Sequence, residues 1–266
     1  MNVLAITWDP PIALFGFLRF YSLMFVIAFA IGFQIMKRIF IAEKIELEKL
    51  DKLLMYVVFA TVLGARLGHV FFYDWAYFSQ HPEEILLPFK FQPTFRFTGF
   101  AGLASHGAAI GIIASLWYFA KYILKQPLLY LLDRVSLTIA AGGVFVRLGN
   151  LMNSEIIGHP THTDYGFIFK ALREDFPRHP TQLYESFGYL IVFAILFYMF
   201  WRTNAKEKLG LIFGVFFTLL WSVRFAVEFF KEAQVDDRAS WALNTGQILS
   251  IPLIVIGVYF IIKAKK

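Results

Sequence analysis

Cysteine is absent from the 266-residue chain. This absence excludes disulfides, a thiolate nucleophile and metal sites with cysteine ligands. Charge is also scarce, because Asp, Glu, Lys and Arg make up 17% of the residues, whereas a soluble domain carries about 25%. Residues 1–18 contain no Lys or Arg, so they lack the basic region of a cleaved signal peptide. We expect the first apolar segment to insert the protein and to remain part of it.

The motifs of common cofactor and hydrolase sites are missing as well. No P-loop, Rossmann glycine motif or GxSxG motif occurs in the sequence. His159 and His162 are three residues apart, as zinc ligands can be, but no HExxH motif or third ligand accompanies them. We therefore expect no metal and no cofactor.

Apolar sequence is abundant: the chain is 58% hydrophobic and 19% aromatic, with a mean hydropathy of +0.61. A membrane-spanning helix needs about 20 mostly apolar residues. The stretches that meet this requirement are roughly 19–36, 53–73, 99–120, 132–148, 183–201, 209–230 and 246–262. The sequence thus predicts an all-α integral membrane protein with about seven transmembrane helices. With no visible repeat or linker, we expect a single transmembrane domain over 1–266, with a larger external segment at about 149–182.

The distribution of Lys and Arg predicts the orientation in the membrane. Cations are dense in the connections 37–52, 121–131 and 202–208 and in the tail 263–266, whereas residues 1–18 have none. The longer loops on the opposite side have fewer, namely Lys90, Arg96, Lys170, Arg173, Arg178, Lys231 and Arg238. Because cytoplasmic loops carry the excess of Lys and Arg, the N-terminus is expected outside and the C-terminus inside. This bias accounts for most of the net charge of +6, suits anionic lipid head groups and requires no nucleic acid.

The segment 42–54, AEKIELEKLDKLL, alternates charged and apolar residues. Glu48 and Lys52 are four residues apart, a spacing that favours an ion pair on one helix face. We interpret the segment as an amphipathic surface helix on the inner face.

Four arginines fall inside the predicted spans: Arg19, Arg66, Arg147 and Arg224. An arginine at the centre of a membrane helix costs about 2.5–3.5 kcal/mol on insertion scales, so each should be near an interface, paired or functional. In the predicted topology all four lie towards the outer ends of their helices, as do Tyr21, His106, Glu228 and Gln247. Snorkelling side chains would populate both ends of the helices. The one-sided distribution therefore predicts a single polar cavity that opens to the outer leaflet.

The chemistry of this cavity points to an anion, and phosphate is the anion that a guanidinium fork matches best. Arg224 and Glu228, four residues apart, are either a self-neutralising pair or an arginine oriented by a glutamate against a substrate. His106, in SHGAAIG, is either structural or a general base. Gly107 and Gly111 beside it allow another backbone or a lipid to approach closely. In HPTQLYE, His179 and Pro180 fit a helix start, and Gln182, Tyr184 and Glu185 supply hydrogen-bonding groups.

These residues resemble the motifs of the bacterial prolipoprotein diacylglyceryl transferases over nearly the whole chain. The family signature G-R-x-G-N-F-x-N-x-E-x-x-G is matched by VRLGNLMNSEIIG at 146–158, with Val146 and Leu151 as departures. The family's HGG segment is HGAAIG here, with Ala108 in place of the second glycine. The other matching segments are RFYSLMF, ARLGHVFFY, HPTQLYE, RFAVEFF and GQILSIP. A tyrosine that the family often has four residues before the span-six arginine is Leu220 here.

The resemblance implies transfer of a diacylglyceryl group from phosphatidylglycerol to the lipobox cysteine thiol of a prolipoprotein signal peptide, with release of glycerol phosphate. It implies a multi-pass protein of the bacterial cytoplasmic (inner) membrane with its active site towards the periplasm. His106 is then the candidate base, and Arg147 and Arg224 would stabilise the phosphate. The residues expected to bind or frame the substrates are Tyr21, Arg66, Arg147, Asn150, Asn153, Glu155, Gly158, His179, Gln182, Tyr184 and Glu228. An anion or lipid transporter, and a lipoprotein-binding module without chemistry, are the alternatives.

Overall fold

The computed structural model describes residues 4–11, 13–14, 18–87, 89–90, 95–97, 102–232 and 243–264. Within them, seven helical segments are long and apolar enough to cross a membrane, as the hydropathy pattern predicts. Six are the α-helices α1 (Phe20–Ala42), α2 (Leu47–Phe72), α5 (Leu128–Met152), α6 (Thr181–Arg202), α7 (Leu211–Val227) and α8 (Thr245–Ala264). The seventh joins α4 (Ser105–Tyr118) to the π-helix η2 (Phe119–Leu124). The orientation stays a prediction; Arg238, Lys265 and Lys266, which contribute to it, lie outside the described residues.

Short elements complete the described chain. The β-strands are β1 (Leu4–Trp8), β2 (Ala13–Leu14), β3 (Leu18–Arg19), β4 (Phe89–Lys90), β5 (Arg96–Phe97) and β6 (Tyr165–Phe169). The short helices are α3 (Trp75–Phe78), η1 (Pro82–Glu84), η3 (Lys170–Leu172), η4 (Asn204–Glu207) and η5 (Glu228–Phe230). Backbone contacts divide the chain into unit 1, residues 1–39 and 132–266, and unit 2, residues 40–131. The single domain expected over 1–266 stays a prediction.

Several helix boundaries differ from the sequence interpretation, and two of the differences have a clear cause. The separate amphipathic helix expected over 42–54 is wrong, because α2 begins at Leu47 and continues without a break into the membrane span. Leu50 and Leu53 are buried, so their helical periodicity belongs to the spanning helix, and only a turn around Lys44, with φ at 57°, separates it from α1. The span expected from residue 99 begins only at Ser105, because Ala104 has extended backbone angles.

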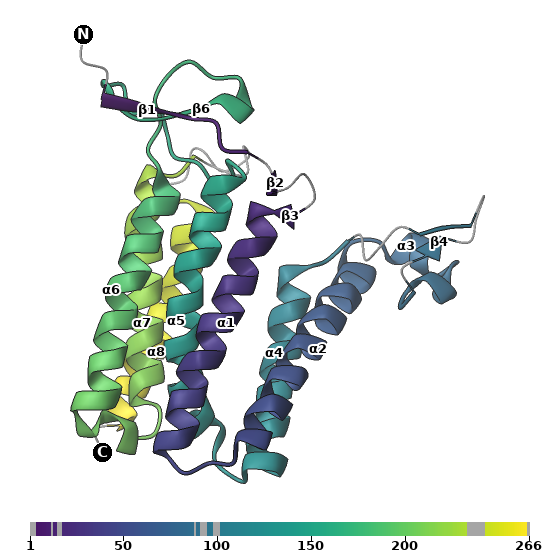
Figure 1. Ribbon diagram of the computed structural model, residues 1–266, viewed down its shortest axis with the longest axis vertical. Helices are drawn as coiled ribbons and strands as arrows, with labels where there is room; N and C mark the ends of the chain where they lie inside the picture. The colour runs from purple at the N-terminus through teal and green to yellow at the C-terminus, as the bar shows by residue number, and fades with distance from the viewer. Residues whose placement is uncertain are drawn as a thin grey trace. The chain divides into compact units, whose positions relative to one another are not determined.

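Unit 1 is a helical bundle with a small sheet at one end. The helices α1, α5, α6, α7 and α8 run side by side, and β1 and β6 lie at one end of them (Figure 1). β1 pairs with β6 in parallel, from Leu4 opposite Tyr165 to Trp8 opposite Phe169. The Trp8 indole donates a 2.9 Å hydrogen bond to the carbonyl of Leu151, and Leu151, Phe167 and Phe169 form a buried apolar cluster below the sheet. The sheet is therefore fastened to the end of α5.

The opposite end of unit 1 holds a buried carboxylate with a structural role. Asp133, near the start of α5, is fully buried. Its two oxygens accept hydrogen bonds of 2.8 Å from the backbone N–H groups of Gly210 and Phe213. These are donors at the start of α7 that have no partner within the helix. Asp133 thus caps α7 from a neighbouring helix.

Unit 2 depends on close packing between α2 and α4. Gly64 and Gly68 of α2 face Gly107 and Gly111 of α4, and the Cα atom of Gly68 lies 2.6 Å from where a Cβ on Gly107 would be. Small residues at such positions let two membrane helices touch through their backbones. The expectation that the Gly107 face admits another backbone is confirmed.

This packing predicts the effect of a single methyl group. Gly107→Ala should destabilise the protein by about 1–3 kcal/mol, because the added Cβ forces α2 and α4 apart. Unfolding of the purified protein in mixed micelles with increasing sodium dodecyl sulfate would measure the loss. Gly142→Ala in α5 is the matched control, since its Cβ would meet the Ala28 Cβ at an ordinary 3.6 Å. Equal stability of the two variants would contradict the prediction.

Candidate active site

The signature residues on α5 and just beyond it form one hydrogen-bonded chain. Arg147 Nη1 donates to Asn150 Oδ1 at 3.2 Å, and Asn150 Nδ2 donates to Glu155 Oε2 at 3.3 Å. Asn153 Nδ2 donates to the other Glu155 oxygen at 3.0 Å. Arg147 and Asn150 are one helical turn apart, so they meet on one face of α5. The structure brings these four predicted residues together.

A second set of charges meets the first at Arg147. Its Nε lies 2.8 Å from Glu185 Oε2, and the other Glu185 oxygen lies 2.9 Å from Lys231 Nζ. Lys231 also pairs with Glu228 at 3.1 Å. The side chain of Glu185 is 0% exposed and that of Lys231 is 4% exposed. Pairing offsets the free-energy cost of burying such charges. Removing one partner would leave the other charge buried without compensation and destabilise the protein.

We call the residues linked in this way the Arg147 cluster: Arg147, Asn150, Asn153, Glu155, Glu185, Glu228 and Lys231. They come from α5, the segment after it, α6, and the segment that begins at η5. The end of α5 and the start of α6 are at the end of unit 1 that carries β1 and β6 (Figure 1). Of the polar residues expected at one end of the helices, the structure brings Arg147 and Glu228 into this cluster. A cavity that opens to the outer leaflet stays a prediction.

Two tyrosines and a second arginine surround the cluster. Tyr21, at the start of α1, is within electrostatic range of Glu155 and Arg147. The Arg147 guanidinium lies 5.8 Å from the centre of the Tyr189 ring on α6. Arg224 on α7 also interacts electrostatically with Tyr189. Arg224 lies over the Trp221 ring at 5.7 Å and makes no ion pair with any described residue. The two arginines assigned to the phosphate therefore share Tyr189 as a neighbour.

The beginning of α6 fastens the signature segment. Gln182 Nε2 donates to the carbonyl of Glu155 at 2.6 Å, and the Thr181 hydroxyl donates to the carbonyl of Ile156 at 2.8 Å. Both side chains are fully buried. Ile156 itself has a φ of 56°, which is uncommon for a β-branched residue and must be held by its surroundings. Gln182 thus positions Glu155, a role that the sequence does not reveal.

Gly158 lies where three chain segments meet. Its N–H donates to the carbonyl of His179 at 3.1 Å, and a Cβ at this position would lie 2.6 Å from that oxygen and 2.7 Å from the carbonyl oxygen of Phe230. Only glycine allows so close an approach. The structure thereby explains Gly158 by packing, and its contact with a substrate stays a prediction.

His179 and Tyr184 form an aromatic group beside this junction. His179 Nδ1 and the Tyr184 hydroxyl are 3.1 Å apart, and both rings pack against Phe230. Burial, and secondarily the charge of His159, lower the pKa of His179 below its usual value. A neutral imidazole is therefore favoured near pH 7, which suits hydrogen bonding to a tyrosine.

Two predicted site residues belong to unit 2. Arg66 is buried and donates from Nε to the carbonyl of Ile85 and from Nη2 to that of Glu84, both at 2.7 Å. Its guanidinium also covers the Phe78 ring at 4.7 Å. It thus fastens the segment after α3 to α2, and a role towards substrate stays a prediction. His106 is the second residue of α4 and lies in its first turn.

A possible metal-ligand group occurs in the same unit. Ligand atoms of His81, Glu83 and Glu84 lie within 4.8 Å of one another. Glu84 already accepts a 2.6 Å hydrogen bond from the Tyr77 hydroxyl. This bond is the main cause that raises the pKa of Tyr77. The buried carboxylate of Glu84 thus has Tyr77 as a hydrogen-bond partner, and Glu83 is exposed.

Lys231 was assigned by sequence only to an external loop, and Glu185 only to the start of a helix. Their pairing joins residues 46 positions apart, which no local spacing can indicate. Helical spacing left open whether Glu228 pairs with Arg224 or orients it against a substrate; in the structure, Glu228 pairs with Lys231. A lysine three residues after that glutamate was the one available signal.

Comparisons with known proteins agree with the signature. The family model for prolipoprotein diacylglyceryl transferase matches residues 11–263. A phosphatidylglycerol–prolipoprotein diacylglyceryl transferase of Bacteroides fragilis is 39% identical over 264 residues, 97% of this chain and 95% of that protein. Proteins of the same name from Tolumonas auensis and Chloroherpeton thalassium are each 38% identical, over 93% and 98% of this chain and 92% and 95% of their own lengths. The chain therefore belongs to the prolipoprotein diacylglyceryl transferase family.

Proposed function

We propose that the Arg147 cluster, with Arg224, is the site at which this chain moves the diacylglyceryl group of phosphatidylglycerol to the cysteine thiol of a prolipoprotein lipobox. Family membership makes the chain a transferase of the first step of lipoprotein maturation. The observation that carries the assignment of the site is the junction of Arg147 with Glu185 and Asn150, at one end of the membrane helices. The cationic group at this junction supports the proposal that a lipid phosphate binds there.

The proposed reaction is a displacement at carbon. The cysteine sulfur attacks the glycerol carbon that carries the phosphate ester, the carbon–oxygen bond breaks, and glycerol phosphate leaves with the electron pair. The thiol, with an ordinary pKa near 8.5, must first lose its proton because the thiolate is the nucleophile. His106 is the proposed acceptor of that proton.

The arginines are proposed to stabilise the leaving phosphate. The Nε and Nη1 sides of Arg147 face Glu185 and Asn150, and a guanidinium has five N–H donors in all, so donors remain for a phosphate oxygen. Arg224 has no anionic partner among the described residues, which leaves its charge for a ligand. Contacts that strengthen as charge builds on the leaving group raise the rate, whereas contacts equal in both states do not.

The remaining polar residues are proposed to hold the geometry. Asn150 accepts a hydrogen bond from Arg147 and donates one to Glu155. It therefore links the position of the guanidinium to that of the carboxylate. Glu155 and Asn153 are the proposed partners of the glycerol hydroxyls. The protein is proposed to lie in the bacterial inner membrane with this site towards the periplasm.

A labelled-lipid assay tests the proposal. Purified protein is incubated with phosphatidylglycerol radiolabelled in its acyl chains and with a lipobox peptide that carries either cysteine or serine at the acceptor position. We expect label on the cysteine peptide only, because a thiolate forms near neutral pH and an alkoxide does not.

The same assay separates the alternatives. Binding of phosphatidylglycerol without labelling of either peptide would favour a lipid-binding module. Release of an anion from protein-containing vesicles, again without labelling, would favour a transporter. Equal labelling of both peptides would contradict the thiolate mechanism.

A further inference from the structure

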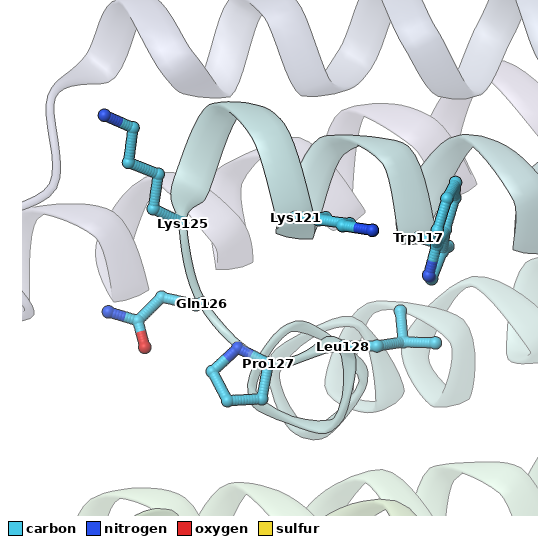
Figure 2. Close-up of a pocket in the computed structure, with 6 residues that line it drawn as sticks. All are labelled: Trp117, Lys121, Lys125, Gln126, Pro127 and Leu128. Atoms are coloured by element: carbon cyan, nitrogen blue, oxygen red, sulfur yellow. The ribbon is translucent and has the colours of Figure 1, made fainter.

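A hollow lies in unit 2, and none of the residues that line it is assigned to the transfer reaction. It is lined by Trp117, Lys121, Lys125, Gln126, Pro127 and Leu128, and has a volume of about 530 Å³. Figure 2 shows Lys121 extending towards Trp117, whereas Lys125 and Gln126 extend away from it. The residues come from the end of α4, from η2, from the turn after it and from Leu128 at the start of α5.

The lining is cationic and has no acidic member. The continuous segment 105–131 contains neither Asp nor Glu. Two of the nearby glutamates at the start of α2 are already matched, because Glu46 pairs with Lys49 and Glu48 with Lys52. The Tyr130 hydroxyl donates to Glu43. Lys121 and Lys125 thus present positive charge that their own segment does not neutralise.

The aromatic neighbours are those of a membrane interface. Lys121 Nζ lies 5.0 Å from the centre of the Trp117 ring and 5.3 Å from that of Tyr122, and both rings are about half exposed. Tryptophan and tyrosine gather at the level of lipid head groups. Pro127 and Leu128 add apolar surface that a glycerol backbone or the start of an acyl chain can cover.

The position along the helix agrees with this level. Ser105–Leu124 is a continuous helical span of 20 residues, which gives about 30 Å at 1.5 Å per residue. That length equals the hydrocarbon thickness of a bilayer. If this helix spans the bilayer, its length puts the hollow at the membrane surface at the end away from His106, which the Lys and Arg distribution predicts to be cytoplasmic.

Lys125 occupies a backbone conformation that glycine would adopt at lower cost. Its φ is 53° and its ψ is 42°, at the end of η2. A side chain in this left-handed region costs about 1–2 kcal/mol, and helices commonly place glycine there. The sequence thus keeps a cationic side chain beside the hollow despite the strain.

We propose that this hollow binds the phosphate head group of an anionic phospholipid, as a second lipid site separate from the Arg147 cluster. Lys121 supplies the charge for one phosphate, and Trp117 packs against the glycerol. Lys125 and Gln126, whose side chains extend away from Lys121 (Figure 2), add positive potential and hydrogen-bonding groups at the rim. A phosphate diester in the leaflet at this end of η2 matches this lining. The site fixes the end of α4 and η2 to that leaflet.

Lipid retention by the full chain tests the site. The purified protein in a neutral detergent is titrated with phosphatidylserine, an anionic lipid that lacks a glycerol head group, and bound lipids are counted by native mass spectrometry. Lys121→Gln and Lys125→Gly should each lower the affinity for one retained lipid by about fivefold, as expected for the loss of one cation at a lipid surface. Lys125→Gly should not lower the unfolding midpoint, because glycine relieves the left-handed backbone.

Controls separate this site from general attraction to anionic lipid. Lys263→Gln in α8 removes a comparable lysine, which lies 5.8 Å from the Tyr259 ring, and should leave the titration unchanged. All three variants should transfer diacylglyceryl groups at the wild-type rate. Equal weakening by Lys263→Gln, no weakening by the two hollow variants, or displacement of the lipid by inorganic phosphate at equal concentration would each overturn the proposal.

Discussion

Arg147→Gln should reduce transfer by about 1,000-fold, the scale seen when one preorganised donor to a developing anion is removed. Glutamine retains a hydrogen-bond donor but has no charge to oppose the phosphate of the leaving group. Arg147→Lys should show a smaller loss, since it keeps the charge but not the planar fork that can contact Glu185 and a phosphate at once. Initial rates with radiolabelled phosphatidylglycerol and a cysteine lipobox peptide give kcat/KM for each variant.

A folding defect could imitate this result, because Glu185 is fully buried and would lose one of its two cations. The double variant Arg147→Gln with Glu185→Gln addresses this, since it removes a charge from each side of the pair. Its free energy of unfolding should be closer to that of the wild type than the value for Arg147→Gln alone. It should still fail to transfer the diacylglyceryl group. Wild-type turnover in any folded variant that lacks Arg147 would remove the arginine from the mechanism.

The sequence predicts one half of this site well, and the reason is local. Arg147 and Asn150 share a helix face by spacing, and Asn153 and Glu155 follow directly, so their contacts need only the end of α5. The same spacing does not decide the partner of Glu228. Its N–H still bonds to the carbonyl of Arg224, four residues earlier, yet its side chain pairs with Lys231.

The other half of the site depends on contacts that are distant in sequence. Gln182 meets the carbonyl of Glu155, and Lys231 meets Glu185, only because α6 and η5 pack beside the end of α5. Similarly, hydropathy locates every spanning helix among the described residues. It nevertheless predicts the first turns of α2 as a separate surface helix, although they belong to the same helix as the span. Apolar composition reports burial in lipid, whereas helix ends depend on backbone angles such as those of Lys44 and Ala104.

Lys231→Met should destabilise the protein by about 3–5 kcal/mol, the cost of breaking a buried ion pair by removing one partner. Lys231 is almost fully buried between Glu185 and Glu228, so its removal leaves two carboxylates to share Arg147. Methionine has a similar length and preserves the packing of the stem. Unfolding in mixed micelles measures the loss, and Lys170→Met, which changes an exposed lysine of η3, should have no comparable effect.

The double variant Lys231→Met with Glu228→Gln decides whether the loss arises from charge. It returns the buried group to a single pair, Arg147 with Glu185, and the remaining amide can still accept a hydrogen bond. We therefore expect it to regain most of the lost stability, with a coupling free energy of at least about 1 kcal/mol between the two positions. Additive losses would mean that the stability contributed by Lys231 does not depend on its ion pair with Glu228. The buried charges would then be independent of one another, and the position of Arg147 would be set by Glu185 and Asn150 without help from Lys231.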